Sequence, residues 1–287
     1  MTGWLEIWPW GLALVAGTMT LAWVIGTLKR DVSVVDIFWG LGFVETVWLY
    51  HLLGDGDRTR GLVVAGAVTL WGCRLAWHIF RRSLGHGEDS RYAEIRARNG
   101  KMFWLTSLFT VFLLQATLVW IISLPLLRAQ IHPEAFGLLD ALGALVFVAG
   151  FAMESVADRQ LQRFRNDPAM KGKVLDTGLW RYTRHPNYFG DALVWWGLFL
   201  MAPAHPWVLI SPLLMTWFLM RVSGVPMLEA KLKRTRPGYA DYVARTNSFF
   251  RWFPKKASAR SFMTPAFARG SASRKIRPGT CRTDRAC

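Results

Sequence analysis

Long apolar runs recur along this chain, and they constrain its fold more than any other feature. A helix needs about 20 mainly apolar residues to cross a bilayer. Runs of roughly that kind occupy residues 8–28, 36–53, 61–80, 103–127, 136–156, 188–202 and 205–222. The sequence therefore predicts an all-α polytopic membrane bundle of about seven transmembrane helices, formed by a single domain over residues 1–254.

The composition agrees with a membrane location. Of the 287 residues, 52% are hydrophobic and 19% are charged, whereas soluble domains carry about 25% charged residues. This balance argues against a water-soluble enzyme and against a disordered chain. The three cysteines are too few for a disulfide framework, and no His/Cys cluster has metal-ligand spacing. We therefore expect no metal site.

The lysines and arginines are distributed unequally between the two sides of the predicted bundle. The segments after the first, third, fifth and seventh runs hold 31 of them, and the opposite side holds 3. Cytoplasmic segments of membrane proteins are enriched in these residues. The pattern predicts an outside amino terminus and a cytoplasmic carboxyl terminus in a multi-pass membrane protein. The first run lacks a basic start and a small-residue cleavage site, so it is not a cleavable signal peptide.

The net charge of +16 follows mostly from this topology and does not indicate nucleic acid as a partner. Anionic lipid or an anionic cofactor would be a further use of it. No protein partner can be inferred. Residues 255–287 carry nine basic residues and one acidic residue and have no apolar periodicity, so we expect a disordered tail.

Ionisable residues inside apolar runs are costly and are candidates for function. Glu45 lies in the second run, and Arg74 and His78 lie in the third at a spacing of four, on one helical face. One interpretation is that Glu45 and His78 line a substrate cavity. The alternative is that Arg74 and His78 are only buried partners for Glu45.

The fifth run ends in charged residues that share one face. Asp158 and Arg165 follow Glu154 at offsets of 4 and 11. A face that is apolar through the membrane and charged at its cytoplasmic end is expected to line an aqueous site. The alternative is a juxtamembrane helix stabilised by salt bridges and by lipid phosphates.

Residues 176–191 form the densest polar segment, DTGLWRYTRHPNYFGD. Pro186 favours the first turn of a helix, and the amino terminus of a helix binds anions through its free N–H groups and its dipole. Arg181 and Arg184 lie just before this terminus, and Asn187 and Asp191 follow on one face. We predict a phosphate-bearing cofactor here. An interfacial Arg/Tyr belt is the alternative, although it would require neither the asparagine nor the aspartate.

The segment GLWRYTRHPNYFGD resembles the steroid 5-alpha-reductase carboxyl-terminal family, in particular its bacterial branch, DUF1295. The segments DVSVVDIFWG (31–40), GEDSRY (87–92) and PGYADY (237–242) carry the same resemblance. It covers about residues 30–254, and it implies a multi-pass protein of the bacterial inner (cytoplasmic) membrane. Isoprenylcysteine carboxyl methyltransferases are more distant relatives that share the Arg-His-Pro-x-Tyr piece.

The resemblance implies a seven-helix membrane reductase that binds NADPH and reduces a C=C bond conjugated to a carbonyl in an apolar, steroid-like or polyprenoid substrate. His78, oriented by Glu45, is the candidate proton donor. The candidate cofactor site comprises Asp158, Arg165, Arg181, Arg184, His185, Asn187, Tyr188, Asp191 and Arg221. The chain has neither the dinucleotide-binding glycine fingerprint nor a phosphate-binding loop. The alternatives are a methyltransferase that uses S-adenosylmethionine and an inactive lipid-binding membrane protein.

Overall fold

A computed structural model of the chain describes residues 3–85, 87–202, 205–222, 229 and 232–249, and within these residues every regular element is helical. The longer helices are α1 (Trp4–Lys29), α2 (Val35–Leu53), α3 (Arg58–Ser83), α4 (Ser90–Asn99), α8 (Leu138–Asn166) and α9 (Pro186–Leu200). The shorter ones are α5 (Phe103–Ser107), α6 (Leu114–Ile122), α7 (Leu124–Ile131), α10 (Ile210–Trp217) and α12 (Tyr239–Arg245).

Short 3-10 and π-helical turns join or extend these helices. The 3-10 turns are η1 (Val32–Val34), η2 (Gly100–Met102), η4 (Pro168–Met170), η5 (Gly178–Arg181) and η6 (Pro206–Leu209), and the π-helical ones are η3 (Leu108–Leu113) and η7 (Phe218–Val222). The all-α prediction is therefore confirmed for the described residues.

Five helical stretches are long and apolar enough to cross a membrane. They are Trp4–Lys29, Val32–Leu53, Arg58–Ser83, Ser90–Ile122 and Leu138–Asn166. The two remaining predicted spans correspond to α9, which has 15 residues, and to the shorter apolar helix Pro206–Val222. The chain is therefore a membrane-type helical protein, while the count of seven and the orientation of the termini stay predictions.

One predicted span is broken in the structure. Residues 103–127 were expected to form a single helix, but α6 ends at Ile122 and α7 begins at Leu124. Pro125 lies in the first turn of α7. A proline has no backbone N–H to donate and clashes with the preceding turn, so it starts a new helix more readily than it continues one.

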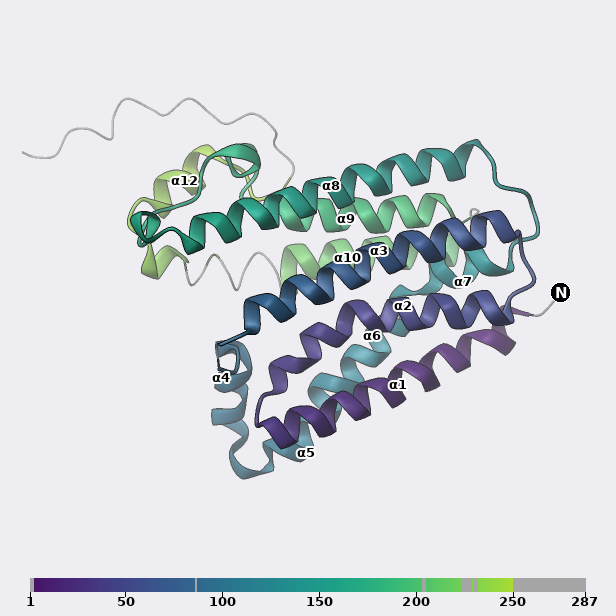
Figure 1. Cartoon of the computed structure of the whole chain (residues 1–287), viewed down its shortest axis with the longest axis horizontal. Helices are drawn as coiled ribbons and strands as arrows, with labels where there is room; N and C mark the ends of the chain where they lie inside the picture. Colours follow the sequence, from purple (N-terminus) through teal and green to yellow (C-terminus); the bar gives the residue numbers. More distant parts are fainter. Residues whose placement is uncertain (1–2, 86, 203–204, 223–228, 230–231, 250–287) are drawn as a thin grey trace, which may run out of the picture. The chain divides into compact units, whose positions relative to one another are not determined.

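Glycines bring α8 and α9 into close contact along their length, and the two helices run side by side in Figure 1. A Cβ atom at Gly190 would lie 2.5 Å from the backbone nitrogen of Glu154, and one at Gly197 would lie 2.6 Å from that of Phe147. Larger side chains at these positions would force the helices apart. The close approach sets the polar end of α8 directly against the first turns of α9.

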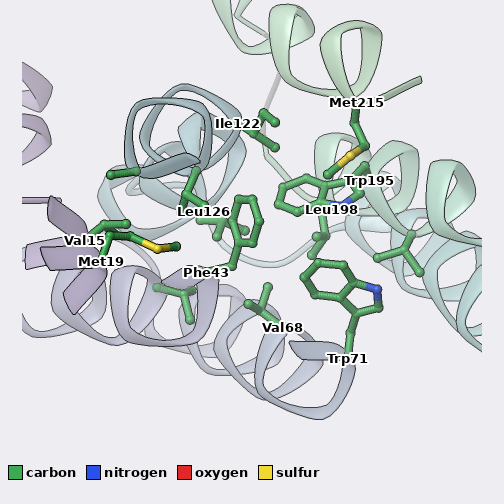
Figure 2. Packing of buried hydrophobic residues seen from close by; sticks show 14 of the residues in the cluster. Val15, Met19, Phe43, Val68, Trp71, Ile122, Leu126, Trp195, Leu198 and Met215 are labelled. Atoms are coloured by element: carbon green, nitrogen blue, oxygen red, sulfur yellow. The ribbon is translucent and has the colours of Figure 1, made fainter. Parts of the chain in front are cut away.

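Aromatic side chains fill the space between α2, α3 and α9 (Figure 2). The ring of Phe43 lies 4.6 Å from that of Trp195, and Trp71 meets Trp195 edge to face at 5.5 Å, measured between ring centroids. All three side chains are fully buried. Edge-to-face contacts add about 0.5–1.5 kcal/mol each beyond the burial of area, so this cluster holds three helices at fixed positions beside the polar end of α8.

The predicted tail, residues 255–287, lies outside the described residues. The organisation of residues 1–254 as a single domain also stays a prediction.

Candidate functional site

Asp158 of α8 is the centre of a polar cluster that joins three helices. Arg74 of α3 donates from Nη1 to Asp158 Oδ2 at 2.7 Å and also forms an ion pair with Glu154. Asn187 of α9 donates from Nδ2 to Asp158 Oδ1 at 3.3 Å. His78 lies one turn after Arg74 and brings Nε2 to 3.8 Å from Asp158 Oδ2, within the range of an ion pair. Asp158 therefore connects α3, α8 and α9.

The inner side of this cluster is apolar. Trp71 donates from Nε1 to Glu154 Oε2 at 3.1 Å, and its ring belongs to the buried aromatic cluster with Phe43 and Trp195. Glu154 is 4% exposed and Asp158 is 7% exposed. Two buried carboxylates require compensation, which Arg74 supplies. Charged groups are thus held where water has little access.

Two acceptor atoms in the cluster have no partner. Asn187 Oδ1 and Asp191 Oδ1 are buried and accept no hydrogen bond from any described residue. The two residues are four apart on α9, so they share a helical face. A buried acceptor without a donor costs about 1–3 kcal/mol. Such a pair is suited to a ligand that brings N–H or O–H donors.

Three arginines gather near the outer end of the cluster. Arg165, on the last turn of α8, lies within electrostatic range of Arg82 at the end of α3 and of Arg236 before α12. The same electrostatic neighbourhood includes Tyr188, whose neighbours are Arg82, Arg165 and Asp158. Within the described part of the chain, none of the three arginines has an ion-pair partner. Asp158 is also within electrostatic range of Arg165, but it is already paired with Arg74. Cations that converge without acids of their own are typical of sites for anions.

The structure separates the two predicted catalytic residues. Glu45 Oε2 accepts a hydrogen bond from Thr18 Oγ1 of α1 at 2.7 Å, whereas His78 approaches Asp158 of α8. The alternative interpretation also needs correction, because Arg74 pairs with Glu154 and Asp158 and not with Glu45. The reason is the packing: Glu45 lies against α1, and the polar face of α3 points toward α8.

The structure also corrects the expected role of Arg184. Its guanidinium is 8% exposed and donates to Glu229 Oε1 at 2.8 Å, to the carbonyl oxygen of Val243 at 3.3 Å, and to that of Thr246. His185 is 1% exposed, and its Nε2 lies 3.2 Å from Glu229 Oε1. Both side chains are engaged in fastening the carboxyl-terminal part of the described chain to the start of α9.

The pKa values of Glu229 and His185 both lie below their ordinary values. Burial raises the pKa of Glu229, but hydrogen bonds from His185 and Arg184 outweigh burial, so its pKa lies below the ordinary value. Burial lowers the pKa of His185, and the nearby Glu229 only partly opposes this effect. At neutral pH the pair therefore contains an ionised Glu229 and a neutral His185.

The remaining predicted cofactor residues are accessible. Arg181 at the end of η5 and Arg221 in η7 are exposed. Tyr188 is half-buried, and its ring stacks on that of His185 with 5.5 Å between centroids. Of the predicted set, the structure brings Asp158, Arg165, Asn187, Tyr188 and Asp191 to the α8–α9 cluster.

A second ion-pair cluster explains two further sequence segments. Asp36 accepts hydrogen bonds from Arg91 at 2.8 Å and from the hydroxyl of Tyr92 at 2.7 Å. Glu88 accepts two from Arg96, at 2.7 and 2.8 Å. Burial raises the pKa of Glu88, but the bonds from Arg96 and from the Val32 amide outweigh it and leave that pKa low. These contacts fix α4 against the start of α2.

Sequence reasoning did not assign Arg82, Arg236 or Glu229 to any site. Arg82 lies at the end of a spanning helix, where the preference for basic residues on the cytoplasmic side already explains it. Arg236 and Glu229 lie in a basic stretch that suits a surface helix equally well. The one available signal was Glu229 itself, a single acid in a basic neighbourhood.

Comparisons with known proteins agree with this architecture. The chain is 25% identical to an uncharacterized protein of Schizosaccharomyces pombe, over 84% of this chain and 78% of that protein. It is 35% identical to the Delta(14)-sterol reductase erg24 of the same organism, over 30% of this chain and 24% of that reductase. No solved structure matches the chain significantly. A family model described as a protein of unknown function (DUF1295) matches residues 22–246. The chain therefore belongs to the DUF1295 family.

Proposed function

We propose that the protein is a membrane-embedded reductase that uses NADPH to reduce a C=C bond conjugated to a carbonyl in an apolar substrate. The observation that carries the proposal is a gradient of polarity along the α8–α9 cluster. Unpartnered buried acceptors, Asn187 Oδ1 and Asp191 Oδ1, lie at its inner end, and unpaired arginines lie at its outer end. NADPH has the complementary gradient, with a carboxamide on the nicotinamide end and negative charge farther along, on the pyrophosphate and on the 2′-phosphate of the adenosine ribose.

The residues present fit the cofactor at both ends. A carboxamide N–H₂ group offers two donors, which would satisfy the acceptors of Asn187 and Asp191. Arg165, Arg82 and Arg236 would hold phosphate oxygens, which arginine binds bidentately. The bound nicotinamide would supply the hydride. The partial match to a sterol reductase is compatible with this chemistry, and such a substrate would arrive through the lipid.

The protein's own groups would prepare the site for reduction of an enone. Phe43, Trp71 and Trp195 keep water away from the inner end. Arg74 neutralises Glu154 and Asp158 and thereby holds α3 against α8. Hydride addition builds negative charge on the carbonyl oxygen, and a donor at that oxygen lowers the barrier. His78 is the candidate donor, with Asp158 as its partner in place of the predicted Glu45.

The two other functions account for less of the site. S-adenosylmethionine carries a positive sulfonium, no phosphate and a single carboxylate, so it offers Arg82, Arg165 and Arg236 far less negative charge than NADPH does. An inactive lipid-binding protein would gain nothing from two unpartnered acceptors buried beside Asp158. Neither alternative explains both ends of the gradient.

Replacing Arg165 with alanine is expected to weaken NADPH binding about tenfold, because one charge-assisted hydrogen bond contributes about 1.5 kcal/mol. The control is Arg159→Ala, which removes the same charge from an exposed position on the same helix. Titration of NADPH into each detergent-purified variant measures the effect. Equal affinities in the two variants would place the phosphate site elsewhere.

Replacing His78 with phenylalanine is expected to leave NADPH affinity within about twofold and to lower turnover about 100-fold, the usual scale for general acid catalysis. NADPH consumption with an apolar enone measures the turnover. Glu45→Gln serves as the matched variant, because Glu45 contacts Thr18 and not His78. Wild-type turnover in His78→Phe would show that this histidine is only a packed polar residue.

A further inference from the structure

An open pocket of about 300 Å³ lies beside the carboxyl-terminal end of α8, away from the polar cluster. Its lining includes Gln160, Arg163, Phe164, Asp167, Met170 and Leu175. Successive residues of an α-helix are turned by about 100°. Arg163 therefore lies about 140° around α8 from Asp158, and Asp167 follows directly after the last helical residue, Asn166. The pocket is on the opposite face of the helix and does not belong to the proposed cofactor site.

The position of this pocket relative to the membrane follows from the length of α8. A helix of 29 residues is about 44 Å long, whereas the hydrocarbon core of a bilayer is about 30 Å thick. The charged residues of α8 gather at its carboxyl-terminal end, from Glu154 onward, so this end is the part that leaves the hydrocarbon. The last two turns, which line the pocket, then lie in the layer of lipid headgroups and just beyond it.

The pocket offers one charge of each sign above an apolar floor. Asp167 has extended backbone at the end of α8, and it forms no ion pair with Arg163. No other described residue pairs with Arg163 either. Asp167 Oδ1 accepts the Ala169 amide at 2.9 Å, which leaves its other oxygen for a ligand. Phe164, Met170 and Leu175 supply the apolar surface.

A rigid loop forms the far wall. The amide of Leu179 donates to Gln160 Oε1 at 3.0 Å, which ties the loop to α8. Gly178 has a φ of 60°, and a Cβ there would lie 2.5 Å from Gln160 Nε2. This amide nitrogen keeps its donors, and it stands on the same wall as Arg163. The pocket thus combines donors for an anion, one acceptor for a cation and an apolar base.

We propose that this pocket binds the headgroup of phosphatidylethanolamine. Arg163 would hold the phosphate, since a guanidinium matches two phosphate oxygens at once. The ammonium group would donate to Asp167, and an acyl chain would leave along Phe164 and Leu175. Phosphatidylcholine has no N–H to donate, and phosphatidylglycerol has no cation for Asp167. The charge pattern therefore favours the ethanolamine headgroup over the choline and glycerol headgroups.

Native mass spectrometry of the detergent-purified full chain tests this proposal. The protein is mixed with equal amounts of phosphatidylethanolamine, phosphatidylcholine and phosphatidylglycerol that carry identical acyl chains. The wild type is expected to retain phosphatidylethanolamine about tenfold more than the other two, because one charge-assisted bond distinguishes them. Arg163→Ala and Asp167→Ala should each remove this preference. Arg159→Ala, the same charge change outside the pocket, should keep it.

A double variant, Arg163→Asp with Asp167→Arg, restores one charge of each sign and should recover part of the preference. Melting temperatures of all variants confirm that each is folded. Equal retention of the three lipids by the wild type would overturn the proposal. So would an undiminished preference in folded Arg163→Ala, and preferential retention of phosphatidylglycerol would indicate a site for anions alone.

Discussion

Replacing Arg74 with methionine is expected to lower the free energy of unfolding by about 3 kcal/mol. Arg74 pairs with both Glu154 and Asp158, and removing one partner of a buried ion pair leaves an uncompensated charge behind, at a cost of about 3–5 kcal/mol. The lower end applies because the Arg74 side chain retains 19% exposure. Thermal unfolding in detergent measures the change, as a drop in melting temperature.

Two further variants make this test specific. Arg58→Met removes an exposed arginine from the same helix and should change the stability by no more than about 0.5 kcal/mol. Asp158→Asn combined with Arg74→Met should recover part of the loss, because the double variant no longer buries that uncompensated charge. If Arg74→Met and Arg58→Met have the same melting temperature, the cluster does not hold α3 and α8 in the way described.

Replacing Arg184 with alanine is expected to destabilise the protein by about 3–5 kcal/mol, and not merely to weaken cofactor binding. Glu229 would lose its main partner, and the carbonyl oxygens of Val243 and Thr246 would lose a donor. Arg181→Ala, three residues earlier and exposed, is the control and should melt like the wild type. A folded Arg184→Ala with unchanged melting temperature and weaker NADPH binding would restore the sequence-based assignment.

The Arg184–Glu229 ion pair makes the stability of the fold depend on pH. The folded pKa of Glu229 is lower than its ordinary value, so its stabilising effect is present above that ordinary pKa. The effect is lost as the pH falls through the lowered value. Arg184→Ala should reduce this acid-side loss, because the hydrogen bonds that depress the pKa are mostly removed.

The elements of the candidate site that sequence could predict are those fixed by local rules. Asn187 and Asp191 share a face because helical geometry requires it, and Pro186 marks where α9 begins. Asp158 and Arg165 follow from the same periodicity on α8. The spacing of apolar residues likewise placed the long helices, with most ends shifted by a few residues and the end of α8 shifted by ten.

Contacts between distant segments were beyond such reasoning. Helix α2 is apolar nearly all round, so nothing local indicates that Glu45 turns toward Thr18 of α1 and away from α3. Arg184 and Glu229 are 45 residues apart, and no periodicity pairs residues at that separation. The break at Ser123 was missed because the apolar run continues through it, although Pro125 was a visible local signal.

The central claim, that the α8–α9 cluster binds NADPH, is tested most directly by the melting temperature of the purified full chain with NADPH, NADH or S-adenosylmethionine. A ligand at about 100 times its dissociation constant adds about 2.7 kcal/mol of stability. The account predicts a clear rise with NADPH and no rise with S-adenosylmethionine, and it predicts that Asn187→Leu, which removes one of the two unpartnered acceptors, reduces the rise. Stabilisation by S-adenosylmethionine alone, or an NADPH effect that is identical in Asn187→Leu, would contradict it.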